Sequence, residues 1–140
     1  KKNEKTEFNY VLMLQPTSPM REEKHVTEII KMLTSENYDA VWTVSETDSK
    51  SHPLKQLVVK NNKLRYYDDR GIDIIARQQL NPVYHRNGIA YAITRRCLLE
   101  QKSIMGYKTG ALICEGVSVN IDTEWDFFLA EQVLNQKNQA

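Results

Sequence analysis

The sequence contains only two cysteines and no long hydrophobic run. Cys97 and Cys114 lack the spacing of metal-binding or redox pairs, and each stands beside apolar residues. We therefore expect two buried free thiols in a reducing, cytoplasmic compartment. No segment reaches the roughly 18 apolar residues that a membrane span requires, and the charged start lacks the apolar core of a signal peptide. These shortages exclude a disulfide scaffold and argue against a membrane partner.

An excess of either charge is also missing. Nineteen basic and 18 acidic residues leave a net charge of +1, so no overall electrostatic field favours nucleic acid as a partner. The common signatures of phosphate-binding loops, dinucleotide-binding turns, Cys-x-x-Cys pairs and zinc proteases do not occur. What remains is an ordinary composition over 140 residues, 41% of them hydrophobic, which is enough for one domain with its own core.

The first third of the chain has the pattern of a strand, a helix and a second strand. Tyr10–Leu14 is almost wholly apolar and is interpreted as a fully buried strand. His25–Leu33 carries apolar residues at helical spacing, and Asp39–Val44 is rich in β-branched and aromatic residues. We expect an α/β fold with a mainly parallel, mixed sheet, layered as in Rossmann-like proteins.

The middle of the chain interrupts this pattern. Two short strand-like runs, Lys55–Lys60 and Lys63–Tyr67, flank an Asn-Asn pair that is typical of a hairpin turn. Asp68–Pro82 is polar and irregular, and it is too long for an ordinary connection. The sequence therefore predicts one domain spanning residues 1–140, into which a protruding arm at residues 46–84 is inserted. The arm has little apolar surface of its own, so we expect it to need a partner and to form a homodimer.

Regular structure is expected again after the arm. The predicted elements are a strand at Gly88–Thr94, a short helix at Arg95–Gln101, strands at Lys108–Cys114 and Val117–Ile121, and a helix at Thr123–Asn135. Trp125 and Phe128 lie at helical spacing in the last helix, which predicts that they belong to the core.

Asn120 and Asp122 stand at the predicted junction between the last strand and the last helix. Residues two apart in a strand point to the same face, and two oxygen-bearing side chains at a strand end can hold a hard cation such as Mg²⁺. The alternative interpretation is a polar loop beside a helix cap, because Thr123 and Asp126 have a capping-box-like spacing. Both interpretations remain open from spacing alone.

The segment from Gln15 to Arg21 (QPTSPMR) follows a strand and precedes a helix. Ligands of open α/β sheets bind at the carboxyl ends of strands, and Gln15, Thr17, Ser18 and Arg21 offer donors for a nucleotide or phosphate. The alternative is that two prolines and a Thr-Ser pair make only a rigid start for the helix.

Further candidate binding groups lie in and after the arm. Lys55, Arg70 and Arg77 are able to bind a carboxylate or phosphate, although cations on a loop are commonly only solvated. Asn87 is able to project its amide into a site, and Gly88 permits close approach of the backbone. A plain Asn-Gly turn is the alternative.

Taken in order, these segments resemble one family, the acylneuraminate cytidylyltransferases. The matching stretches are LQPTSPMR (14–21), DAVWTVS (39–45), HPLK (52–55), RQQL (77–80) with Pro82, NGIAY (87–91) and NIDTEWD (120–126). Each stretch alone is weakly specific, but their order and spacing are specific. The resemblance runs from about Tyr10 to Leu134.

The resemblance implies a nucleotidyltransferase that transfers CMP from CTP to a sialic-acid-type nonulosonic acid and releases pyrophosphate. Mg²⁺ is the implied cofactor, held in the family by an acid pair that matches Asn120 and Asp122, which we take as the catalytic and metal-binding positions. Lys55 and Arg77 match positions in a dimerisation arm that reaches toward the partner's site. Gln15, Asn87 and Tyr91 match positions that line the nucleotide–sugar pocket.

Two departures from the family pattern matter. The leading acid of the metal pair is Asn120, a neutral residue that weakens the electrostatic hold on a cation. The family's N-terminal nucleotide loop also has no counterpart in residues 1–9. We expect the chain to correspond to the C-terminal part of such an enzyme and to be inactive alone. The alternatives are a non-catalytic dimerisation or sugar-binding module, and an activating enzyme for legionaminic, pseudaminic or 3-deoxy-octulosonic acid.

Overall fold

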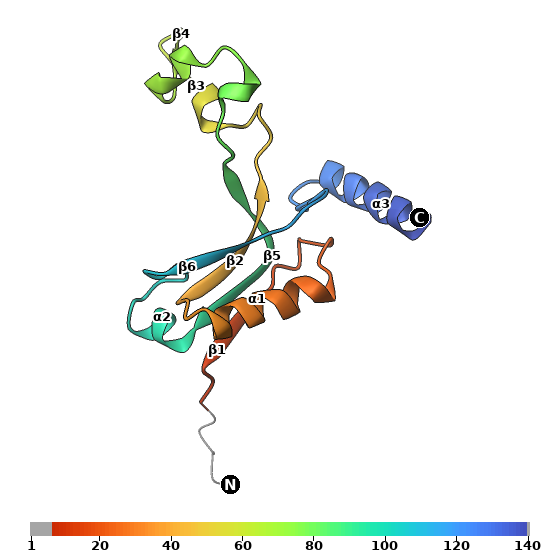
Figure 1. Ribbon diagram of the computed structural model, residues 1–140. Helices are drawn as coiled ribbons and strands as arrows, with labels where there is room; N and C mark the ends of the chain where they lie inside the picture. The colour runs from red at the N-terminus through yellow and green to blue at the C-terminus, as the bar shows by residue number, and fades with distance from the viewer. Residues whose placement is uncertain (1–6, 140) are drawn as a thin grey trace. The chain divides into compact units, whose positions relative to one another are not determined.

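The computed structural model describes residues 7–139 and has an α/β fold (Figure 1). Residues 1–6 and residue 140 lie outside this range. The prediction that residues 1–9 hold no nucleotide loop therefore falls mostly outside the described residues. The strands are β1 (Tyr10–Met13), β2 (Ala40–Glu46), β3 (Leu57–Lys60), β4 (Lys63–Tyr66), β5 (Tyr84–Thr94) and β6 (Thr109–Ile113). The α-helices are α1 (Glu23–Ser35), α2 (Arg95–Leu99) and α3 (Glu124–Gln139).

The main sheet has four strands in the order β1-β5-β2-β6. β2 and β6 run parallel, with Ala40 opposite Thr109, whereas β1 and β5 run antiparallel, with Tyr10 opposite Thr94. The predicted α/β class and mixed sheet are confirmed, but the expectation of a mainly parallel sheet is wrong. The reason is that β5 lies between β1 and β2 and separates the two strands that the sequence pattern joins through α1.

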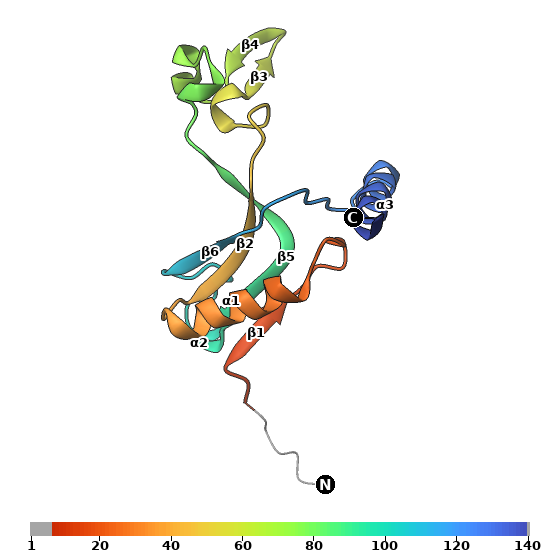
Figure 2. The same cartoon turned by 45° about the vertical axis from the view of Figure 1, so that its right-hand side comes forward.

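The core lies on both faces of this sheet. On one face α1 contributes Ile29 and Leu33, which cluster with Val41 and other residues of the sheet. Helix α1 begins at a capping box, in which Glu22 N donates to His25 Nδ1 at 3.0 Å. The other cluster contains Tyr91 and Cys97, the latter from α2. Figure 2 shows α1 and the strands from a second direction. Of these two helices, α2 follows β5 directly, whereas residues 14–22 connect β1 to α1.

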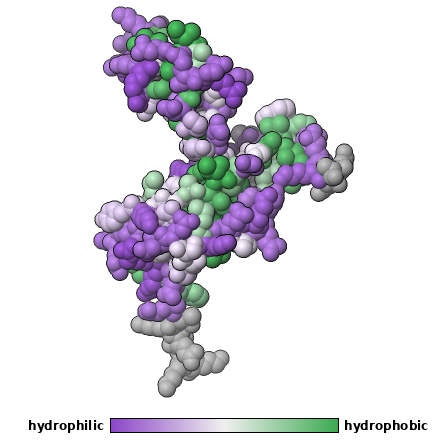
Figure 3. Space-filling view, viewed as in Figure 1, coloured by the Kyte–Doolittle hydropathy of each residue, from purple (hydrophilic) through white to green (hydrophobic). Residues whose placement is uncertain are grey.

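Three expectations from the sequence are wrong. β1 is an edge strand, and Tyr10 and Val11 are exposed, so the apolar run is not fully buried. No strand forms at residues 117–121. Trp125 and Phe128 do not lie in the core, since their side chains are 65% and 47% exposed. Figure 3 shows hydrophobic surface over α3. Helical spacing correctly predicted the helix but not whether anything covers its apolar side.

Residues Glu46–His85 form a separate compact unit, which we call the arm. Strands β3 and β4 pair as an antiparallel hairpin, as the sequence predicts. Asn61 and Asn62 have φ angles of 52° and 59°, the left-handed conformation that a tight two-residue hairpin turn requires. Short 3-10 turns η1 (Pro53–Lys55), η2 (Asp69–Asp73) and η3 (Arg77–Gln79) make up much of the irregular stretch.

The two cysteines are buried and free, which confirms the prediction made from their neighbours. Burial raises the pKa of both thiols, because a thiolate is poorly solvated inside the protein. Among the helices of residues 7–139, none is both long enough and apolar enough to cross a membrane.

Candidate functional site

Three segments that are distant in sequence meet beyond the end of β1. Ser18 Oγ lies 3.1 Å from the backbone oxygen of Asn87 and 3.1 Å from Asn120 Oδ1. Thr17 Oγ1 also lies 3.1 Å from Asn120 Oδ1, and Ile121 N donates to the backbone oxygen of Thr17. The structure therefore brings together the 15–21 loop, the Asn-Gly turn and the 120–122 junction, three segments that the sequence analysis considered one at a time.

Gly88 makes this close approach possible. Its φ angle is +71°, and a Cβ atom added there would lie 2.2 Å from Gln15 Oε1 and 2.5 Å from Ser18 Oγ. Any larger residue would be strained and would collide with both side chains. The glycine thus lets the amide of Gln15 pack directly against the turn.

Arg21 holds the loop in place. Its Nε donates to the backbone oxygen of Ile89 at 2.6 Å, and its Nη2 donates to the backbone oxygen of Gln15 at 2.5 Å. Hydrogen bonds from a guanidinium to buried carbonyls are stronger than neutral ones. Two of its donor atoms are therefore engaged in fixing the loop to β5.

Asn87 is buried, with its side chain directed into the sheet. Its Oδ1 accepts from Thr43 Oγ1 at 2.7 Å, and its Nδ2 donates to Ser45 Oγ at 3.0 Å. We call these three residues the Thr43–Ser45–Asn87 network. Thr43 and Ser45 were not singled out in the sequence, although two small hydroxyl residues two apart in an apolar strand are a signal for a polar partner across the sheet.

The 120–126 segment is open to solvent and carries the predicted helix cap. Asp126 Oδ2 accepts from Thr123 N at 2.8 Å and from Thr123 Oγ1 at 2.8 Å, while Thr123 Oγ1 accepts from Asp126 N at 3.2 Å. The Thr123 hydroxyl, followed by the Asp122 amide, lowers the pKa of the Asp126 carboxyl. The capping interpretation is confirmed. The side chain of Asp122 takes no part in the cap.

Tyr91 lies in the core on β5. It is buried, and its ring meets Trp42 edge-on, with ring centroids 5.1 Å apart. Such edge-to-face pairs of aromatic rings stabilise a core beyond the area they bury. Among the expected site residues, Tyr91 is thus the one packed most clearly for stability.

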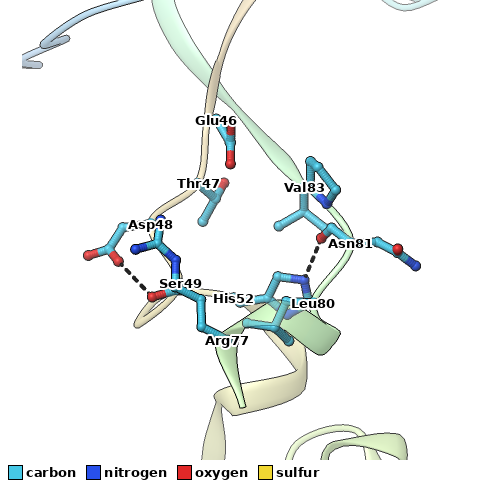
Figure 4. A pocket seen from close by; sticks show the side chains of 10 residues that line it. Glu46, Thr47, Asp48, Ser49, His52, Arg77, Leu80, Asn81 and Val83 are labelled. Carbon is cyan, nitrogen blue, oxygen red and sulfur yellow. Dashed lines mark hydrogen bonds between the residues drawn. The ribbon is translucent and has the colours of Figure 1, made fainter. Parts of the chain in front are cut away.

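The arm carries a cavity of its own, of about 370 Å³. Figure 4 shows its lining: Glu46, Thr47, Asp48, Ser49, His52, Arg77, Leu80, Asn81, Pro82 and Val83. His52 Nδ1 accepts from Leu54 N at 3.1 Å, so Nε2 carries the proton and donates to the Asn81 backbone oxygen, 3.1 Å away. Arg77 lines this cavity, whereas Lys55, at the end of η1, is exposed and does not.

The donor set for a metal ion is small. Among the described residues, no group of three or more His, Cys, Asp or Glu side chains could hold a cation. Asp122 supplies one exposed carboxylate, and the Asn120 Nδ2 atom lies 3.5 Å from Asp122 Oδ2. The amide nitrogen, not the amide oxygen, faces the carboxylate, so Asp122 is the one carboxylate that this junction offers, and a cation here would take its other ligands from water or from a bound phosphate.

This geometry defines a class of protein, namely an α/β protein in which loops cluster at the end of a strand. No family model matches the chain. It is 29% identical over 138 residues to the CMP-N,N'-diacetyllegionaminic acid synthase of Legionella pneumophila, covering 95% of this chain and 57% of that protein. It is 28% identical over 137 residues to the N-acylneuraminate cytidylyltransferase of Escherichia coli, covering 96% of this chain and 32% of that protein.

A third relative is the N-acylneuraminate cytidylyltransferase of Streptococcus agalactiae, 30% identical over 118 residues, which cover 83% of this chain and 28% of that protein. These matches confirm the resemblance: over most of its length the chain is a relative of the acylneuraminate cytidylyltransferases. The chain spans about half of the Legionella protein and about a third of the Escherichia protein.

Proposed function

We propose that this chain is the part of a nonulosonic acid cytidylyltransferase that holds the sugar, the metal ion and the phosphates of the nucleotide. The observation that carries the proposal is the meeting of the 15–21 loop, the 87–88 turn and the 120–122 junction at the end of β1. In the reaction, the anomeric hydroxyl of the sugar attacks the α-phosphorus of CTP and loses its proton to water. The bond to the β-phosphate breaks, and pyrophosphate leaves.

The nucleotide is assigned to the 15–21 loop. Gln15 is half-buried against Gly88, so its amide is fixed near the junction, and the hydroxyls of Thr17 and Ser18 lie next to Asn120. Arg21 adds positive charge to the same loop while it fixes the backbone of Gln15. A preorganised set of donors is suited to an anionic phosphate because little reorganisation is needed when charge develops.

Mg²⁺ is assigned to Asp122 together with phosphate oxygens of the nucleotide. When bound, the ion offsets the negative charge that develops on the departing pyrophosphate. Asp122 is exposed and lies two residues after Asn120, whose side chain contacts the loop assigned to the nucleotide. Asp122 therefore contributes the charge that a neutral Asn120 does not.

The sugar and the dimer are assigned partly to the arm. Arg77 lines the arm cavity and is suited to a sugar carboxylate, and Lys55 is a second cation of the arm. In the other unit, Asn87 and Tyr91 are buried and support the sheet. The register of the hairpin places Leu57, Val59 and Leu64 on one face, all three exposed. We assign this face to contact with a second copy of the chain, because such an apolar surface favours burial.

The function is tested by isothermal titration calorimetry of the chain with N-acetylneuraminic acid, with N,N'-diacetyllegionaminic acid, and with CTP plus MgCl₂. We expect one of the sugars to bind, and CTP binding to weaken in Asp122→Asn but not in the distant control Asp73→Asn. We also expect no CMP-sugar product from the chain alone. Failure of all three ligands to bind would overturn the proposal.

A second candidate is a non-catalytic dimerisation or sugar-binding module. It is favoured by Asn120, which stands where the family pattern has an acid. Sugar binding without any measurable CTP binding, even at high MgCl₂, would favour this module over the enzyme part. Light scattering reports the dimer in both cases, and a monomer at micromolar concentration would contradict the assigned role of the arm.

A further inference from the structure

Helix α1 begins with a cap in which the acceptor is a histidine ring. The N–H of Glu22 donates to His25 Nδ1 at 3.0 Å, and the N–H of His25 donates to the backbone oxygen of Glu22 at 3.1 Å. A capping box ordinarily has Glu or Gln at this third helical position, where a side-chain oxygen is the acceptor. In this chain a ring nitrogen, which is able to take up a proton, stands in its place.

The carboxylate of Glu22 is engaged elsewhere. It pairs with Lys24 Nζ at 2.8 Å and with Lys137 Nζ, from α3, at 2.9 Å. Hydrogen bonds from Lys24 and then from Lys137 lower the pKa of Glu22 to about 2, so this carboxylate stays ionised at neutral and mildly acidic pH. Among the described residues, the acceptor of the Glu22 N–H is therefore His25.

Only a neutral imidazole is able to fill this role. Nδ1 accepts a hydrogen bond in the tautomer that carries its proton on Nε2, whereas both nitrogens carry a proton in the charged ring. After protonation, the Nδ1–H group would face the Glu22 N–H group across 3.0 Å, a donor against a donor. The ring and the peptide then have to separate. His25 lines a cavity of about 280 Å³, which gives the ring room to move.

The surroundings of His25 favour the neutral ring. Its exposed fraction is only 8%, and burial is the main cause that lowers its pKa, because the charged ring is poorly solvated there. Glu22 and Glu28 oppose this shift, whereas Lys24 and Lys137 add to it. The charged and titratable groups around the ring come from α1 and its cap, from α3 and from the segment after β6: Glu22, Lys24, Glu28, Lys137, Cys114 and Glu115.

The peptide that His25 holds adjoins the 15–21 loop. Its N–H belongs to Glu22 and its carbonyl to Arg21, whose guanidinium donates to the backbone oxygens of Ile89 and Gln15. Arg21 is thus fixed both through its side chain and through the peptide that follows it. When the ring releases this peptide, the backbone of Arg21 is free to turn, and the loop loses one of these two anchors.

We propose that His25 is a pH-sensitive positioning residue, whose neutral ring holds the Arg21–Glu22 peptide and whose protonation releases this peptide and loosens the 15–21 loop. The inference rests on the proposed function only for the ligand, since the nucleotide is assigned to this loop. Because the folded chain disfavours the charged ring, the cap is complete above the ordinary histidine pKa of about 6.5 and is lost as the pH falls through the lowered folded value.

Nuclear magnetic resonance of the ¹⁵N-labelled chain without ligand tests the release between about pH 8 and about pH 5, where histidine changes its charge. We expect the His25 ring and the backbone amides of Arg21 and Glu22 to titrate with one shared midpoint, below that of an ordinary histidine. In His25→Gln, the glutamine supplies an acceptor that does not titrate, so the Glu22 amide should stay in place. The Cys97 amide, which donates to Thr94 Oγ1, is the internal control.

Two results would overturn the proposal. If the His25 ring titrates while the Glu22 amide stays in place, protonation does not release the peptide; the natural chain alone decides this point, even where a variant does not fold. If the Glu22 amide still moves in His25→Gln, another group causes the movement. Glu28→Gln removes a neighbouring acid and should lower the shared midpoint. Loss of the movement in Glu28→Gln would assign it to that acid and likewise contradict the role of His25.

CTP binding supplies the functional readout. In calorimetry with MgCl₂, CTP binding should weaken from about pH 8 to about pH 5.5, and it should weaken about fivefold more in the natural chain than in His25→Gln, as expected for one helix cap. Protonation of CTP itself affects both proteins equally. His25→Leu, which lacks an acceptor, should bind CTP weakly at both pH values.

The outcomes of this titration separate the two proposals. Equal pH dependence in the natural chain and in His25→Gln would show that the cap does not act on the nucleotide loop, and the inference would fail. If CTP binds to neither protein at either pH, the proposed function fails, while the shared titration of the His25 ring and the Glu22 amide persists.

Discussion

The Thr43–Ser45–Asn87 network buries polar groups, whereas the arm hairpin exposes apolar ones. In the network, buried hydroxyl and amide groups pair with each other at 2.7 to 3.0 Å. In the hairpin, apolar side chains are exposed, Val59 by 70%, and among residues 7–139 no acid forms an ion pair with Lys60, Lys63 or Arg65. The polar groups of the network have hydrogen-bond partners within the network, whereas the hairpin has a surface that favours contact with another molecule.

The largest expected effect comes from the core beside the network. Ile29 on α1 is fully buried, so Ile29→Ala removes packed methyl groups and leaves a cavity. We expect a loss of about 2–5 kcal/mol in the free energy of unfolding, measured by urea denaturation. Ile30→Ala, at the exposed neighbouring position on the same helix, should cost much less. Equal losses in the two variants would contradict the assignment of the core.

Asp39 extends the comparison to a buried charge. Its carboxyl accepts from the backbone N–H groups of Lys108 and Tyr107 and pairs with Arg96. The Lys108 N–H group, followed by Gln101, lowers the pKa of Asp39. Asp39→Asn should cost about 1.5–3 kcal/mol near neutral pH, because hydrogen bonds to a charged group are lost.

The lowered pKa of Asp39 also predicts how the free energy of unfolding changes with pH. The unfolded chain binds the proton more readily, so the stabilisation is complete above the ordinary carboxyl pKa and disappears as the pH falls through the lowered folded value. Urea denaturation between neutral and strongly acidic pH should therefore show a flatter acid limb in Asp39→Asn than in the natural chain. Asp73→Asn, at an exposed turn of the arm, should leave that limb unchanged; parallel limbs for the natural chain and Asp39→Asn would refute this role.

Thr43→Val tests the network itself. Valine keeps the shape of threonine but removes the hydroxyl that donates to Asn87 and accepts from Ala90 N at 2.9 Å. Leaving these buried groups without a partner should cost about 1–3 kcal/mol. Thr27→Val, at an exposed position on α1, is the matched control and should cost less. A neutral Thr43→Val would mean that the network adds no stability.

The smallest effect on stability is expected in the arm. Val59→Lys and Leu64→Lys change exposed side chains on one face of the hairpin, so each should alter the free energy of unfolding of a monomer by only about 0.5 kcal/mol. The same changes should shift the chain from dimer to monomer in sedimentation velocity. Lys63→Gln, on the opposite hairpin face, should leave the dimer intact. A dimer that survives both lysine substitutions would show that this hairpin face is not the dimer contact, and the contrast with the network would no longer hold.

Local signals in the sequence predicted most of the elements. Helical spacing around Ile29 and Leu33 predicted α1, and the Asn61-Asn62 pair predicted the hairpin, because turn residues and periodicity act over a few positions. The strand expected at residues 117–121 did not form. Its apolar residues resemble a strand, but the segment bonds to the 15–21 loop through Ile121 N rather than to a neighbouring strand.

The candidate site was predictable in its parts but not in its contacts. Gln15, Ser18, Asn87 and Asn120 were each chosen for a local reason, and the fold brings them together. Their hydrogen-bond partners were not predictable, since Ser18 and Asn120 are separated by 102 positions in the chain. The burial of Asn87 by Thr43 and Ser45 likewise depends on β5 lying beside β2.

The sequence by itself determined the α/β class, the hairpin turn, the α3 cap and the relation to the cytidylyltransferases, because these depend on short patterns and on their order. Only the tertiary structure decided the mixed strand order, the exposure of Tyr10 and Trp125, and the meeting of Asn120 with Ser18. These features depend on which surfaces face one another across the fold. The residues next to a position in the sequence do not determine which surface it will face.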